Sequence, residues 1–166
     1  TNNGVMVGWG ANTNDQRYSV RINKTAADGA MNALRLEIQG SRAVATKPIN
    51  DREWHHIAIT HSTGARIGEV SFYVDGNLDT ISGTAGGGLI NTASTAVVLG
   101  NSGHATATYG FDGALDEVRI YDHVLAQAEI QQIMKGAPAG QASSPHPADQ
   151  AADVPWDVTL SWSPGK

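Results

Sequence analysis

The amino-acid sequence predicts an all-β protein, a sandwich or a barrel of short antiparallel strands. Composition gives the first indication, because the 166 residues include 19 glycines together with many Val, Ile and Thr residues, which favour strands joined by tight turns. The second indication is the recurrence of short apolar runs at close intervals with turn residues between them. A chain of this length buries enough surface to be stable as one domain.

Seven short runs are the predicted strands. They are residues 5–9, 18–22, 34–38, 55–60, 70–74, 97–99 and 115–121. Asp75 and Gly76 follow the fifth run, and both residue types tolerate the positive φ that a two-residue hairpin turn requires. The polar stretches 12–15, 83–88 and 101–110 are predicted loops.

One short helix is predicted after the last strand. Ala126, Ile130, Ile133 and Met134 fall at helical spacing, and Gly136 lies where the pattern ends. Residues 137–156 are rich in Ala, Pro, Ser and Gln, a composition that predicts a linker between domains. Residues 157–166 then begin with a strand-like alternation, as at the start of a following module.

The adjacent pair His55 and His56 raises the question of a metal or catalytic site. Successive side chains of a strand point to opposite faces, so the two imidazoles cannot converge on one ion. The favoured interpretation is an amphipathic strand whose histidines are hydrogen-bonded near its ends.

Charge and composition exclude several classes of partner. The net charge is −5, and no basic cluster is visible along the sequence, which argues against nucleic acid and anionic membrane surfaces. No apolar run approaches the roughly 20 residues of a membrane span, so membrane insertion is not expected. The chain has no cysteine and therefore no disulfide framework.

Five motifs in order resemble the laminin-G-like, concanavalin A-like jelly-roll domains of bacterial secreted proteins. They are EWHHIAIT (53–60), VSFYVDG (70–76), VVLG (97–100), GFDGALDEVRIYD (110–122) and LAQAEI (125–130). The resemblance implies a two-sheet antiparallel jelly-roll sandwich with one short C-terminal helix. It also implies one module of a longer extracellular or cell-surface protein, with polysaccharide or glycan as partner and a structural calcium ion.

The resemblance also predicts the domain boundaries. Residues 1–136 correspond to a jelly roll that lacks its first strands, and the tail resembles the opening of an immunoglobulin-like or fibronectin-like module. Missing strands would leave an open sheet edge, which residues 157–162 can fill within one chain or by strand exchange with a second copy. Neighbouring domains of the same polypeptide are the other expected partners.

Asp116 is the candidate metal ligand. Its parity matches Val118 and Ile120, so it is predicted to face the core, where a carboxylate needs a cation, an arginine or backbone amides. The resemblance implies calcium, held by the side chain and carbonyl oxygen of Asp116. The alternative is an aspartate bonded to backbone amides without a metal, and the sequence leaves both open.

Catalysis is not predicted. Glucanases of the family that this chain resembles carry Glu-x-Asp-x-x-Glu, whose two glutamates act as nucleophile and acid. None of the five glutamates of this chain fits that pattern. A Gly-x-Ser-x-Gly nucleophile motif is also absent from the sequence.

The candidate ligand-binding residues are Tyr109, Trp9 and His104. Sugars stack on aromatic faces beside planar polar groups. Tyr109 and His104 fall in a predicted loop, whereas Trp9 and Trp54 are better explained as sheet packing. The leading function is therefore a non-catalytic carbohydrate-binding module, with a structural or adhesive spacer as the alternative and a glycoside-active enzyme as the third.

Overall fold

The computed structural model describes residues 4–93, 95–102, 109–136, 143–146 and 161–163. The chain forms two compact units, Thr1–Leu125 and Ala126–Lys166. The strands described in the first unit are β1 (Val5–Gly10), β2 (Arg17–Ile22), β3 (Ala33–Ile38), β4 (Ser41–Pro48), β5 (Ile57–Thr60), β6 (Ser71–Val74), β7 (Asn77–Asp79), β8 (Ile81–Ala85) and β9 (Val98–Leu99). Two 3-10 turns, Ala26–Asp28 and Ile67–Glu69, lie between them.

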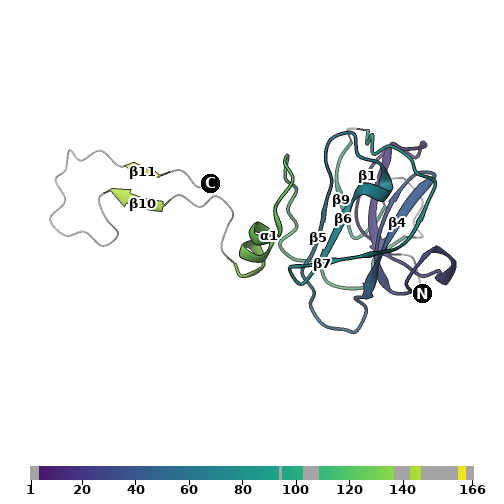
Figure 1. Ribbon diagram of the computed structural model, residues 1–166, viewed down its shortest axis with the longest axis horizontal. Helices are drawn as coiled ribbons and strands as arrows, with labels where there is room; N and C mark the ends of the chain where they lie inside the picture. The colour runs from purple at the N-terminus through teal and green to yellow at the C-terminus, as the bar shows by residue number, and fades with distance from the viewer. Residues whose placement is uncertain (1–3, 94, 103–108, 137–142, 147–160, 164–166) are drawn as a thin grey trace. The chain divides into compact units, whose positions relative to one another are not determined.

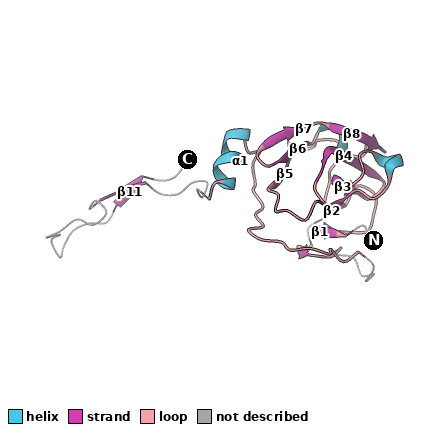
Figure 2. Cartoon of the chain, turned by 90° about the horizontal axis from the view of Figure 1, so that it is seen from below, coloured by secondary structure: helices cyan, strands magenta, loops and turns pink. Residues whose placement is uncertain are grey.

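The described strands of the first unit form two antiparallel sheets. The larger sheet has the order β8-β4-β3-β2-β1-β9, and the smaller has the order β5-β6-β7. Figure 1 shows the smaller sheet beside the larger one, and Figure 2 shows β1 to β4 following one another across the larger sheet. The predicted all-β sandwich with a short C-terminal helix is confirmed.

The core lies between the two sheets because one face of each strand is apolar. Val20 of β2 pairs with Leu36 of β3, and Ile22 pairs with Leu34. Phe72 of β6, in the smaller sheet, packs in one hydrophobic cluster with these residues and is fully buried. Each large aliphatic or aromatic side chain buried in this way stabilises the fold by about 1.5–3 kcal/mol.

The predicted hairpin turn at Asp75 and Gly76 is confirmed between β6 and β7. Both residues have positive φ, 53° and 72°, as a type I′ turn requires. The Asp75 carboxylate also accepts hydrogen bonds from Lys47 Nζ at 2.6 Å and from the backbone N–H of His56 at 3.2 Å. The turn is thereby tied to β4 and to the segment that precedes β5.

Strands β4 and β8 were not among the predicted strands, whereas β7 is the second strand of the predicted hairpin. Small residues explain the omission of β4 and β8: Ala43 and Ala45 are fully buried although they give no strong apolar signal. Gly83 belongs to β8 and not to the predicted loop 83–88. A Cβ at this position would lie 2.3 Å from the carbonyl oxygen of Asp28. The glycine marks a close approach of two backbone segments.

The predicted strand at 115–121 is wrong. No strand is assigned between Phe111 and Leu125, a stretch that the structure describes throughout. Glu117 has a φ of 50°, a left-handed conformation that interrupts an extended chain. Val118 and Ile120 are consequently 39% and 60% exposed and do not enter the core.

The second unit contains the predicted helix and one strand pair. Helix α1 spans Gln127–Met134, its Ile130 is buried, and Gly136 follows with a φ of 80°. Strand β10 (Ser143–His146) falls within the predicted linker and pairs antiparallel with β11 (Ser161–Ser163). Most of 137–156 and of the predicted strand 157–162 lies outside the described residues. No helix in the described part of the chain has the length and apolar character needed to cross a membrane.

The N-cap of α1, Ala126, has no side-chain acceptor, in agreement with the sequence. Glu129 Oε2 accepts the backbone N–H of Ala126 at 2.7 Å, which supplies half of a capping box. We expect Ala126→Ser to stabilise the helix by about 1 kcal/mol, because the hydroxyl can accept an orphan N–H of the first turn. A higher melting temperature and slower amide exchange in α1 would check this; an unchanged melting temperature would remove the cap assignment. Gln132→Ser, at an exposed interior position of α1, should not stabilise.

The two adjacent histidines lie just before β5, which begins at Ile57, and not within the strand. His55 bridges two carboxylates, with Nδ1 3.1 Å from Asp75 Oδ2 and Nε2 3.0 Å from Asp51 Oδ1. His56 contacts Asp75 through its backbone N–H. The predicted hydrogen-bonded histidine near the strand end is confirmed for His55.

Stability is expected to fall with rising pH through His55. Burial acts to lower the pKa of this imidazole, but the hydrogen bonds and charges of Asp75 and Asp51 outweigh burial and raise the pKa. A folded-state pKa above the unfolded value of about 6.5 means that the stabilisation is complete below about pH 6.5 and is lost as pH rises through the folded-state pKa.

Urea unfolding of the wild type and His55→Gln from about pH 5 to 8 measures this contribution. The difference in unfolding free energy between the two proteins should shrink as pH rises, and a constant difference would contradict the assignment. His56, whose pKa is lowered by burial, is present in both proteins, so its opposite contribution cancels.

Candidate functional site

The outer face of the larger sheet carries a cluster of charged side chains. Strand β2 alternates Arg17, Ser19 and Arg21 with core residues, and β3 does the same with Arg35 and Glu37. The register pairs Ser19 with Glu37 and Arg21 with Arg35, so these side chains share one face. We call Arg17, Arg21, Arg35, Arg42, Asp28 and Glu37 the arginine cluster.

Glu37 is the centre of the arginine cluster. Its carboxylate forms ion pairs with Arg17, Arg21 and Arg35. Burial acts to raise the pKa of Glu37, but the charges of the three guanidiniums outweigh it, and the pKa lies below its usual range. Burial lowers the pKa of Arg21 in turn, with Glu37 opposing part of that shift. The carboxylate is therefore held in its charged form.

Positive charge exceeds negative charge in the arginine cluster. Asp28, from the first 3-10 turn, pairs with Arg35 Nη1 at 2.6 Å and Arg42 Nη2 at 2.5 Å. Four arginines therefore face two carboxylates, which leaves a formal charge of about +2 in the cluster. This local positive charge is opposite in sign to the net charge of −5 of the whole chain.

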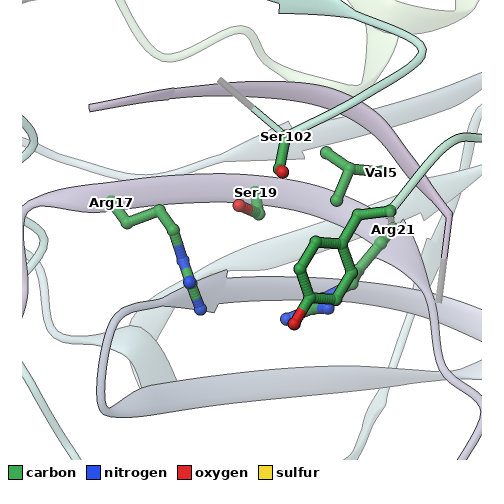
Figure 3. Close-up of a pocket in the computed structure, with 6 residues that line it drawn as sticks. Val5, Arg17, Ser19, Arg21 and Ser102 are labelled. Atoms are coloured by element: carbon green, nitrogen blue, oxygen red, sulfur yellow. The ribbon is translucent and has the colours of Figure 1, made fainter. Parts of the chain in front are cut away.

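A small hollow opens beside the arginine cluster. It is lined by Val5, Arg17, Ser19, Arg21, Ser102 and Tyr109. Figure 3 shows Arg17, Ser19 and Arg21 on one strand, with Ser102 facing them. The hollow measures about 10 Å³, enough for about one water-sized group.

Tyr109 is placed against the hollow by its backbone and its ring. Its carbonyl oxygen accepts the backbone N–H of Val5 at 2.9 Å, which fixes the segment at the start of β1. The guanidinium carbon of Arg21 lies 5.8 Å from the centre of the Tyr109 ring, within range of a cation–π interaction. A planar cation, an aromatic ring and the hydroxyls of Ser19 and Ser102 therefore meet at one place.

Trp9, another predicted ligand-binding residue, does not lie with Tyr109 at the hollow. Trp9 stacks on Tyr18 at 4.1 Å between ring centroids and packs against the core cluster. His104 lies outside the described residues. Trp54, interpreted from the sequence as packing, is 69% exposed, so that interpretation is wrong. A ligand role for Tyr109, Trp9 or His104 stays a prediction.

Asp116 does not face the core, so the predicted orientation is wrong. The residue is exposed, and its Oδ1 accepts the backbone N–H of Glu117 at 2.8 Å. The left-handed conformation of Glu117 breaks the alternation on which the prediction depended. No three His, Asp or Glu side chains converge as metal ligands among the described residues. Calcium at Asp116 stays a prediction from the resemblance.

The arginine cluster was missed because no two of its arginines are adjacent in sequence. Arg17 and Arg21 belong to RYSVRI, and Arg35 belongs to LRLEI. One feature of the sequence could have revealed the cluster. The polar positions that alternate with core residues in β2 and β3 are mostly charged. Strand pairing then concentrates charge that appears dispersed along the chain.

Comparison with known proteins identifies the family. A family model of the laminin G type, described as the concanavalin A-like lectin/glucanases superfamily, matches residues 1–131. No curated protein and no solved structure matches the chain. The matched residues include both sheets of the sandwich and most of the chain. The chain therefore belongs to the concanavalin A-like lectin/glucanases superfamily.

Proposed function

We propose that this chain is a non-catalytic carbohydrate-binding module of an extracellular or cell-surface multidomain protein. The observation that carries the proposal is the position of Arg21 against the Tyr109 ring at the hollow. A guanidinium offers planar hydrogen-bond donors, and an aromatic ring offers a face for the apolar side of a sugar. Membership of a superfamily that includes lectins supports the same function.

The absence of catalysis is part of this proposal. Glycoside hydrolysis requires two carboxyl groups at a defined separation, one of which acts as an acid. Glu37, the carboxylate nearest the centre of the cluster, is charged and paired with three arginines. Such a group is poorly suited to donate a proton, because its pKa is lowered and not raised.

A glycan-array screen of the full chain tests the proposal. It is run with calcium and again with chelator, and the melting temperature is recorded in both. We expect glycan binding that Tyr109→Ala abolishes and Trp54→Ala preserves, since Trp54 is not among the residues that line the hollow. Binding lost only with Trp54→Ala would place the site elsewhere, and the absence of any hit would remove the function.

The same screen also tests calcium binding, which we propose on the resemblance alone. If Asp116 contributes to a calcium site, calcium should raise the melting temperature and Asp116→Asn should abolish the rise. A melting temperature that is equal in calcium and in chelator would remove calcium from the description of this chain.

Exposed apolar residues favour a second candidate function, that of a structural or adhesive module. Val118, Ile120 and Val124 are 39%, 60% and 51% exposed within one segment before α1. Apolar surface of this kind is suited to contact with a neighbouring domain or a second copy. Analytical ultracentrifugation distinguishes the two functions: self-association that Ile120→Ser abolishes, without a glycan hit, would favour the structural module.

A further inference from the structure

We propose that the hollow between Arg21 and Tyr109 binds the carboxylate of an acidic sugar, of the uronic acid class. The inference rests on the proposed carbohydrate-binding function and specifies the chemistry of its ligand. It is carried by three independent observations: the charge of the arginine cluster, a buried donor without an acceptor, and the size of the hollow.

The charge of the arginine cluster favours an anion. Four arginines face Asp28 and Glu37 on a sheet face where the side chains of Arg21 and Glu37 are 9% and 12% exposed. Cations that are largely withdrawn from water need compensating negative charge. The two carboxylates of the cluster supply only part of it, so a bound anion would be stabilised by the remainder.

The donor groups suit a carboxylate oxygen. The Nε of Arg21 is buried and has no hydrogen-bond partner among the described residues. Arg21 also lines the hollow, next to the buried side chains of Ser19 and Ser102. A guanidinium N–H donates a short, charge-assisted hydrogen bond to a carboxylate oxygen.

The size of the hollow sets the limit on what enters it. A space of about 10 Å³ admits about one water-sized atom, so one oxygen of the carboxylate fits. The rest of the sugar would stay outside. Tyr109 is only partly buried and would contact the sugar that bears the carboxylate.

Calorimetric titration of the full chain with a matched pair of ligands tests this inference. The ligands are an oligogalacturonate and the same oligomer with its carboxylates methyl-esterified, which removes the charge and keeps the sugar. We expect the acid to bind at least tenfold more tightly than the ester. Its affinity should also fall with added salt, although less steeply than for an exposed charge pair.

A pair of arginine variants locates the site. Arg21→Gln is expected to weaken acid binding at least tenfold, whereas Arg52→Gln makes the same change of charge in an exposed loop and should leave binding unchanged. Glu37 keeps Arg17 and Arg35 in Arg21→Gln, so the variant should fold. If its circular dichroism shows that it does not, Ser19→Ala replaces it, with an expected loss of about threefold.

The outcomes separate this inference from the function on which it rests. Equal binding of acid and ester, with the array hits retained, would overturn the carboxylate site and keep the carbohydrate-binding function. No binding of any glycan, acid or neutral, would overturn both. An Arg21-dependent rise of melting temperature in acetate without glycan binding would show a free-anion site only and count against an acidic sugar.

Discussion

Glu37→Gln is expected to lower the free energy of unfolding by about 3–5 kcal/mol, the range found when one partner of a buried ion pair is removed. Three arginines share this carboxylate, and the side chains of Glu37, Arg17, Arg21 and Arg35 are all between 9% and 12% exposed. Glutamine has nearly the same shape but cannot offset their charge. The arginines would then repel one another in a place that water reaches poorly.

Urea unfolding at neutral pH measures this loss. Glu117→Gln is the matched control, because it makes the same substitution in an ion pair with Arg119 whose side chains are 37% and 72% exposed. Exposed pairs contribute about 0–1 kcal/mol, so the control should be nearly neutral. Similar losses in the two variants would show that burial does not strengthen the Glu37 interactions.

Phe72→Ala is expected to destabilise the protein by about 3–5 kcal/mol, since a fully buried phenylalanine leaves both lost transfer free energy and a cavity. Phe72 is 0% exposed and stands opposite Ile59 in the centre of the smaller sheet. It also packs in the cluster that joins the smaller sheet to the larger one. Its loss therefore weakens the contact between the two layers of the sandwich.

The control for Phe72→Ala is Leu78→Ala on the neighbouring strand β7. Leu78 is 58% exposed, and substitutions at such surface positions usually change stability by no more than about 0.5 kcal/mol. For a chain of this length, the expected loss at Phe72 corresponds to a melting temperature lower by on the order of 10 °C. A fall of only a degree or two for Phe72→Ala would mean that the surrounding side chains close the cavity.

The larger part of the fold was predictable because its strands alternate strongly. The sequences of β2 and β3 separate core residues from polar residues at every second position, and Asp75-Gly76 gives an unambiguous turn signal. By contrast, β4 depends on Ala43 and Ala45, whose small side chains are buried by their neighbours and not by their own hydrophobicity. In 115–121, Val118 and Ile120 alternate with Glu117 and Arg119, but the left-handed backbone of Glu117 makes this alternation misleading.

The candidate site was much less predictable, because it depends on strand register and on contacts between distant residues. The sequence gives no direct sign that Arg21 of β2 stands opposite Arg35 of β3. Tyr109 reaches the hollow through a backbone hydrogen bond to Val5, near the other end of the unit. The sequence alone identifies Tyr109 as an aromatic residue in a predicted loop, but it does not identify Arg21 as the partner of its ring.

The arrangement of three arginines around Glu37 has a consequence for the entropy of recognition. An arginine side chain that moves freely in water carries about 2 kcal/mol of rotamer entropy, which a ligand must overcome when it immobilises the side chain. Here Glu37 restricts Arg17, Arg21 and Arg35 when the protein folds. These arginines therefore lose their side-chain entropy when the sheet folds and not when a ligand binds. A ligand that reaches this face encounters guanidiniums that are already preorganised.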